Sequence, residues 1–142
     1  MPKELTSTAS TTIDSPVANV WDALVNPEMI KQYMFGAVAE SDWNEGSPII
    51  WKGEYEGRTY EDKGVIQKLQ PERILQYTHY SPLAGKSDIP ESYHTVTIEL
   101  SAQDGATKVQ LSQDNNSDEE AREHTAKFWQ GMLDTLKKLL EG

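Results

Sequence analysis

The sequence predicts an α+β fold in which a curved antiparallel sheet wraps around one long C-terminal helix. Three observations support this class. Residues 38–114 alternate apolar and polar side chains with a period of two, which is typical of strands with one buried face. Two short helical segments follow the first strand. Residues 117–141 carry a broad apolar stripe at helical spacing, which indicates a helix that packs on a wide surface.

Length and charge exclude several classes of protein. The chain has 142 residues, close to the ~150 of one domain. Its 23 Asp and Glu against 13 Lys and Arg give a net charge of −10, which repels phosphate backbones and anionic lipid, so we expect no nucleic-acid or membrane partner. It has no cysteine, hence no disulfide or thiolate site. We expect a cytoplasmic protein with a flexible segment 1–5 and a single domain over residues 6–142.

The N-terminal elements are predicted from β-branched residues and proline signals. Residues 6–14 are rich in Thr and Ile, which favours a first strand. Ser15-Pro16 places a hydroxyl cap before a proline and predicts a helix of about ten residues. Asn26-Pro27 repeats this signal and predicts a second short helix that ends near Tyr33.

The middle of the chain is predicted to form the rest of the sheet. Asp104-Gly105 is a strong hairpin signal between the last two strands. Residues 81–92 form the one long loop, and loops of this length are often lids or binding loops. The strands that the alternation delimits cover residues 49–55, 58–69, 73–80, 93–100 and 107–111.

The last segment is predicted to be a long amphipathic helix. Ser117 and Glu120 have the spacing of a capping box, and acidic residues fill the first turn. A stripe this broad needs a large concave partner, and the inner face of the sheet is the one available. The stripe consists of Phe128, Trp129, Met132, Leu133, Leu136, Leu139 and Leu140.

Several motifs resemble one family over residues 6–141. The opening Ile13-x-Ser15-Pro16-x-x-x-Val20-Trp21-x-Ala23-Leu24-x-x-Pro27-Glu28 is similar to that of the activator of heat-shock protein 90 ATPase homologue family, within the START-like (SRPBCC) superfamily. Later matches are Gly64-x-Ile66, Pro71-x-Arg73-x-Leu75, Thr107-x-Val109-x-Leu111 and Trp129-x-x-x-Leu133-x-x-Leu136-Lys137-x-x-Leu140-Glu141. The resemblance implies the helix-grip (START/Bet v 1-like) fold. It also implies a cavity between sheet and helix that holds apolar small molecules.

Two histidines are candidates for polar contacts in such a cavity. Alternation places His79 and His94 on inward faces, both beside the long loop. They are expected either to bind a ligand oxygen or act as acid–base groups, or else to be part-buried side chains satisfied by neighbours. If Gly64 faces inward, Asp62 does too, and its carboxylate would form an acid–base pair with one of these histidines.

Aromatic side chains dominate the remaining candidates, although core filling is the competing interpretation for each one. Tyr and Trp combine a large apolar body with one polar atom, which suits a partly polar ligand. Phe128 is expected in the interior with the others. The candidate ligand-binding residues are Phe35, Trp51, Tyr55, Tyr60, Tyr77, His79, His94, Val96, Phe128 and Met132.

The sequence favours a binding protein over an enzyme. We expect a hydrophobic or amphipathic small molecule as partner. Nucleophile, phosphate-loop and His-Glu-x-x-His motifs are absent from the sequence, so no catalytic residue is assigned and no cofactor is expected. His124 is expected on the polar side of the last helix, and no metal site is expected. The alternatives are a cavity enzyme that uses the inward histidines and a co-chaperone-like interaction module, and we expect a monomer or weak homodimer.

Overall fold

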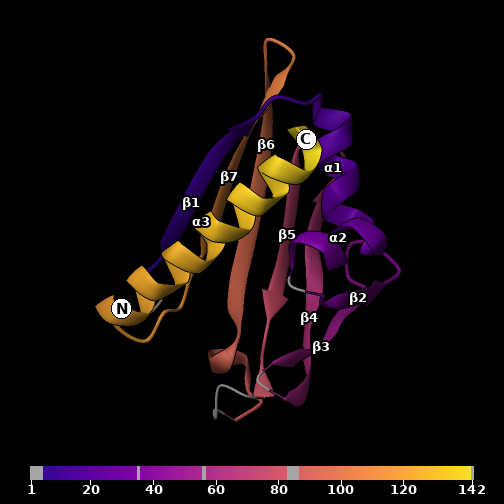
Figure 1. Cartoon of the computed structure of the whole chain (residues 1–142). Helices are drawn as coiled ribbons and strands as arrows, with labels where there is room; N and C mark the ends of the chain where they lie inside the picture. The colour runs from indigo at the N-terminus through magenta and orange to yellow at the C-terminus, as the bar shows by residue number, and fades with distance from the viewer. Residues whose placement is uncertain (1–4, 35, 56, 83–86, 142) are drawn as a thin grey trace.

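The computed structural model describes residues 5–34, 36–55, 57–82 and 87–141 (Figure 1). Seven strands, three α-helices and one 3-10 turn are found in these ranges. In chain order they are β1 (Ser7–Ile13), α1 (Val17–Val25), α2 (Pro27–Tyr33), β2 (Val38–Ser41), β3 (Pro48–Tyr55), β4 (Arg58–Gln70), β5 (Ile74–His79), η3 (Pro90–Ser92), β6 (His94–Gln103), β7 (Ala106–Gln113) and α3 (Glu119–Glu141).

The strands form one antiparallel sheet in the order β1-β7-β6-β5-β4-β3-β2. β1 and β2 follow each other in the sequence yet lie at opposite edges, and α1 and α2 carry the chain from one edge to the other (Figure 1). α3 lies diagonally across one face of the sheet, alongside β1, with α2 near its C-terminal half. This is the helix-grip architecture, so the predicted fold class is confirmed.

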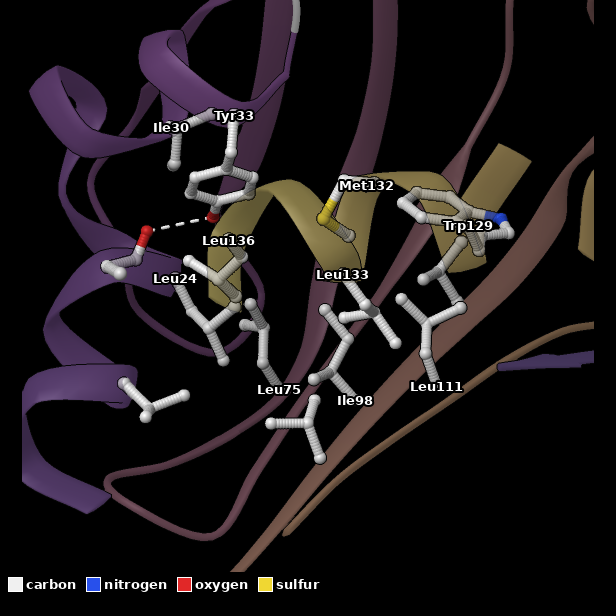
Figure 2. Packing of buried hydrophobic residues seen from close by; sticks show 14 of the residues in the cluster. Leu24, Ile30, Tyr33, Leu75, Ile98, Leu111, Trp129, Met132, Leu133 and Leu136 are labelled. Atoms are coloured by element: carbon white, nitrogen blue, oxygen red, sulfur yellow. Dashed lines mark hydrogen bonds between the residues drawn. The ribbon is translucent and has the colours of Figure 1, made fainter. Parts of the chain in front are cut away.

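The C-terminal half of α3 is fixed by the main hydrophobic core. Figure 2 shows Met132, Leu133 and Leu136 pointing toward Leu75 and Ile98 of the sheet. All five side chains are buried, and each contributes about 1.5–3 kcal/mol through the apolar surface it removes from water. The broad apolar stripe of the sequence therefore packs on the sheet, as predicted.

The two short helices complete this core at the far end of α3. Tyr33 of α2 is buried, and its hydroxyl donates a hydrogen bond of 2.8 Å to the carbonyl oxygen of Ala23 in α1 (Figure 2). Asn26 caps α2 as predicted, since its side-chain oxygen accepts a hydrogen bond of 3.0 Å from the backbone N–H of Glu28. One hydrogen bond thus ties the two helices together within the core.

Two predicted caps are wrong. Pro16, not Ser15, occupies the cap position of α1 and gives no side-chain hydrogen bond, and the Ser15 hydroxyl accepts one from the Asn19 amide instead. The cap of α3 is Asp118 rather than Ser117, because Asp118 Oδ1 accepts a 2.8 Å hydrogen bond from the Ala121 N–H. A carboxylate at that position also interacts favourably with the positive end of the helix dipole.

The sequence did not delimit the edge strand β2. Residues 38–41 pair with β3, but only Ala39 of these four residues is buried, and one buried position is too few to recognise as alternation.

Among the described helices, none combines the length and the apolar character that crossing a membrane requires.

The buried tyrosines predict a loss of stability at alkaline pH. Burial raises the pKa of the Tyr33 and Tyr77 hydroxyls above the ordinary value of about 10. The unfolded chain therefore loses these protons first, and the free energy of unfolding falls as the pH rises above ~10. Tyr33→Phe should make this fall shallower and, by removing the bond to Ala23, cost about 1 kcal/mol at neutral pH. Urea denaturation at several pH values measures both effects, and an unchanged alkaline slope would contradict this explanation.

Candidate functional site

A cavity of about 750 Å³ lies between the sheet and the N-terminal half of α3. Strands β3 to β7 supply its floor, and α3 supplies the opposite wall. Its lining is mainly aromatic, with a few acidic and hydrogen-bonding groups. The lining residues are Met34, Ala37, Trp51, Glu54, Tyr60, Asp62, Tyr77, His79, Ser81, His94, Gln113, His124, Thr125, Phe128 and Trp129.

The floor of the cavity is a continuous group of rings that the strand registers bring together. Trp51 of β3 lies 5.1 Å from Tyr77 and 5.2 Å from His79 of β5, measured between ring centroids. His79 is directly opposite His94 of β6, and these rings are 6.5 Å apart. Side chains at alternate positions share one face of a strand, so the inward alternation that the sequence indicates produces this cluster.

Two glycines make room for the polar side chains of the floor. Gly64 of β4 approaches the backbone of β5 so closely that an added Cβ would collide with the Thr78 carbonyl oxygen. At Gly53 of β3 the Tyr60 side chain lies across the strand, and an added Cβ would be 2.5 Å from its hydroxyl oxygen. Larger residues at either position would displace Tyr60 or separate β4 from β5.

Asp62 and His79 form a hydrogen-bonded pair at one end of this floor. His79 Nε2 lies 2.9 Å from Asp62 Oδ2, and their side chains are 29% and 14% exposed. An ionised carboxylate only accepts, so in this pair Nε2 carries the hydrogen and donates it. Asp62 Oδ1 is buried and accepts no hydrogen bond from any described residue. The sequence-based expectation of a carboxylate beside an inward histidine thus matches the geometry.

His94 is held in the opposite orientation. Its Nδ1 donates a hydrogen bond of 2.9 Å to the backbone carbonyl of Asp114. The Asp114 side chain in turn accepts a 2.7 Å bond from the Thr95 N–H, which fixes the end of β6 against the segment that follows β7. The neutral His94 ring therefore carries its lone pair on Nε2, whereas neutral His79 carries its lone pair on Nδ1.

A smaller, more polar cavity of about 240 Å³ adjoins the histidines. It shares His79 and His94 with the large cavity and is otherwise lined largely by hydroxyl and amide side chains. These are Ser81, Ser92, Gln113, Asn116, Ser117 and Thr125. The combined space is apolar and aromatic on one side and hydrogen-bonding on the other.

The charge of Asp62 influences the neighbouring phenol. Burial, and then the negative charge of Asp62, raise the pKa of the Tyr60 hydroxyl.

Among the described residues that line the two cavities, none is a Lys or an Arg. No group of three or more His, Cys, Asp or Glu side chains in the described ranges is placed to hold a metal ion.

The structure brings six of the predicted residues together in the cavity lining: Trp51, Tyr60, Tyr77, His79, His94 and Phe128. Phe128 was expected in the interior, but it is 42% exposed, because the half of α3 that carries it covers the cavity rather than the packed core. Val96 is buried in the core, opposite Tyr77. Met132 is also buried and borders a separate space of about 30 Å³. Phe35 and the Tyr55 side chain lie outside the described parts.

Several lining residues were not among the predicted ligand-binding set. His124 was expected on the polar side of the helix; it is exposed, yet it lies at the cavity with Thr125. Residues 121, 124, 125 and 128 share one helix face, so helical spacing from Phe128 would have identified them. Glu54 also borders the cavity, near the end of β3, although alternation along the strand places it on the face opposite Trp51.

The sequence matches a known family over most of its length. Residues 14–141 match the family described as "Activator of Hsp90 ATPase homolog 1-like protein". The chain belongs to this family and thereby to the START-like (SRPBCC) superfamily, as its motifs indicated. The fold is thus that of a ligand-binding or co-chaperone-like domain. A comparison with curated proteins gives no match.

Solved structures include a close relative and more distant ones. The solution structure of ChR145 from Cytophaga hutchinsonii is 52% identical, with 96% of this chain and 93% of that chain covered and a TM-score of 0.85. CalU16 from Micromonospora echinospora is 21% identical, with coverage of 95% and 75% and a TM-score of 0.76. The Aha1 dimer from Colwellia psychrerythraea is 19% identical, with 96% of both chains covered and a TM-score of 0.75. The last two likenesses show the shared fold.

The close approach at Gly64 predicts a stability difference between two glycines. Gly64→Ala should destabilise the protein by about 2–3 kcal/mol, the upper range for one substitution, because β4 and β5 must separate. Gly131→Ala is the matched control, because Gly131 lies at an exposed position of α3 where an added Cβ meets no atom within 4 Å. This substitution should raise the free energy of unfolding by roughly 0.5–1 kcal/mol. Chemical denaturation measures both. Equal effects of the two substitutions would contradict the close approach.

The two histidines are predicted to adopt different neutral tautomers. His79 should carry its proton on Nε2, which faces Asp62, and His94 on Nδ1, which faces the Asp114 carbonyl. Long-range ¹H–¹⁵N correlation spectra of the imidazole rings, recorded above the pH of histidine titration, distinguish the tautomers directly. The same tautomer in both rings would show that one of these hydrogen bonds is absent in solution.

Proposed function

We propose that the protein binds a hydrophobic or amphipathic small molecule in the cavity between the sheet and α3. The observation that carries this proposal is the aromatic cavity of about 750 Å³, within the range of about 300–1,000 Å³ of small-molecule sites. Three of the polar side chains in its lining, Asp62, His79 and His94, lie together on the floor beside the aromatic rings. Such a combination orients a ligand that has an apolar body and one polar end.

The exposure of Phe128 supports the same proposal. This large apolar side chain remains 42% exposed although its ring lies 5.1 Å from the Trp129 ring, between centroids, in a T-shaped arrangement on the cavity wall. Covering apolar surface with a ligand is favourable by roughly 25 cal/mol per Å². A bound apolar molecule would therefore recover free energy that the folded chain alone does not gain at this wall.

The Asp62–His79 pair favours one alternative, a cavity enzyme. A histidine oriented by a carboxylate is a common arrangement for a general base, and His94 lies opposite it. The two functions differ in what His94→Ala removes. In an enzyme, turnover is lost while ligand affinity is retained, whereas in a binding protein the substitution acts on affinity alone.

The family description also supports a second candidate function, interaction with another protein. A co-chaperone-like role would use the acidic surface of a chain with net charge −10, but charge alone confers little specificity. We therefore favour the cavity over the surface as the functional site. A cytoplasmic location and a monomeric or weakly dimeric state remain predictions.

Filling the cavity from α3 tests the proposal. Thr125 lines both spaces, so Thr125→Trp should occupy them and weaken binding of the neutral dye N-phenylnaphthylamine at least about tenfold, the effect of losing some 1.4 kcal/mol. Lys127→Trp adds the same ring at an exposed position two residues away and should leave binding unchanged. Dye fluorescence measures affinity, and circular dichroism verifies folding. Equal affinity in the two folded variants would place the binding site elsewhere.

A further inference from the structure

The cavity is acidic as well as aromatic. The charged side chains in its described lining are carboxylates, Asp62 and Glu54, and no described lining residue of either cavity is a Lys or an Arg. A ligand with an anionic end would thus bring a second negative charge toward Asp62 without a cation to receive it. Like charges in a partly desolvated site repel strongly, so this lining disfavours fatty-acid-type ligands.

Asp62 has an incomplete set of hydrogen-bond partners. One carboxylate oxygen accepts from His79, whereas Oδ1 is buried and accepts from no described group. A buried acceptor without a donor is unfavourable, and ionised acceptors more so. Asp62 lines the large cavity, so a ligand bound there can bring a hydrogen-bond donor to this carboxylate.

Aromatic rings surround this carboxylate on neighbouring strands. Trp51 is its direct partner across the β3–β4 pair, and Tyr77 lies 5.1 Å beyond Trp51. Tyr60 precedes it by two positions on the same strand, and burial, followed by the negative charge of Asp62, raises the pKa of the Tyr60 hydroxyl. The faces of Trp and Tyr rings attract cations, and a carboxylate beside such faces forms a site for an ammonium group.

We infer that the ligand is an amphipathic amine, with its protonated amino group against Asp62 and the adjacent ring faces and its apolar body along the aromatic wall toward Phe128. This inference rests on the proposed function and specifies its ligand class. The amino group supplies the hydrogen-bond donor and the positive charge that Asp62 lacks. Phe128 and Trp129 supply the apolar surface at the opposite wall.

Three amphiphiles with the same tail test the inference. Decylamine, decanol and decanoate, each below its micelle-forming concentration, compete with N-phenylnaphthylamine for the cavity at neutral pH and moderate salt. The wild-type protein should bind decylamine about tenfold or more tightly than decanol, because an ammonium group forms a charge-assisted hydrogen bond with a carboxylate that a hydroxyl group does not. Decanoate should bind most weakly. The assay measures displacement of the dye, so it reports only binding at the site that the dye occupies. Decylamine bound elsewhere on the acidic surface does not displace the dye and is not detected.

A matched pair of variants then assigns the preference to one carboxylate. Asp62→Asn should lower the affinity of decylamine to that of decanol. Glu61→Gln removes the same charge one residue away, at an exposed position on the other face of β4, and should keep the wild-type order. The ranking in the wild-type protein tests the inference even if Asp62→Asn fails to fold.

The outcomes separate this inference from the proposed function. Decanoate binding as tightly as decylamine, or a decylamine preference that survives in folded Asp62→Asn, overturns the inference while the binding function stands. Equal affinity for decylamine and decanol in the wild-type protein also overturns it. Failure of the dye and all three amphiphiles to bind overturns the proposed function and the inference together.

Discussion

The rest of the structure depends on the anchoring of α3 along the β1 edge of the sheet. Its C-terminal half is buried through Met132, Leu133 and Leu136, which have 1% exposure or less. Side chains of α3 also reach the backbone of β1: Gln130 Nε2 donates to the Ser10 carbonyl at 3.0 Å, and Lys137 Nζ donates to the Thr12 carbonyl at 2.6 Å. With the helix held at this edge, its N-terminal half spans the open face over β3 to β6.

Trp129 marks the boundary between core and cavity. Its ring is buried at 6% exposure, and its indole N–H donates a 2.7 Å hydrogen bond to the Gln113 side chain of β7. Beyond it toward the helix N-terminus, Phe128 and Thr125 face the cavity rather than the core. One helix therefore both closes the core and forms the wall of a binding space, which explains why its apolar stripe extends further than the core requires.

The period-two alternation, the helical stripe and the family motifs predicted the fold because all three indicate a sheet packed against one long helix. The two-residue alternation gave the inward faces of β3 to β7, and the helical stripe gave the buried side of α3. The cavity was harder to predict, because Phe128 and Met132 both fit the apolar spacing of the helix, although Phe128 lines the cavity and Met132 is buried in the core. What separates them is the angle of the helix across the sheet, which no local pattern encodes.

Gly64 shows how a local signal determined one contact of the site. Because Gly64 was expected to face inward, Asp62, two residues earlier, was expected on the same face. In the structure, the missing side chain of Gly64 lets β4 lie close to β5, and Asp62 hydrogen-bonds to His79. The cap of α3 was missed because neighbouring residues compete for the same unpaired backbone N–H groups at the start of the helix. Ser117 and Asp118 both suit the cap of α3, and only the three-dimensional course of the chain selects Asp118.

Intermolecular nuclear Overhauser effects between N-phenylnaphthylamine and the protein test the central claim most directly. A ligand in the cavity should give them to the Trp51 indole and the Phe128 ring, which lie on opposite walls. A second hollow of about 460 Å³ is lined by polar residues of β1, β6 and β7, among them Thr97 and Ser112. Contacts to these residues, with none to Trp51 or Phe128, would show that the space beneath α3 is not the binding site.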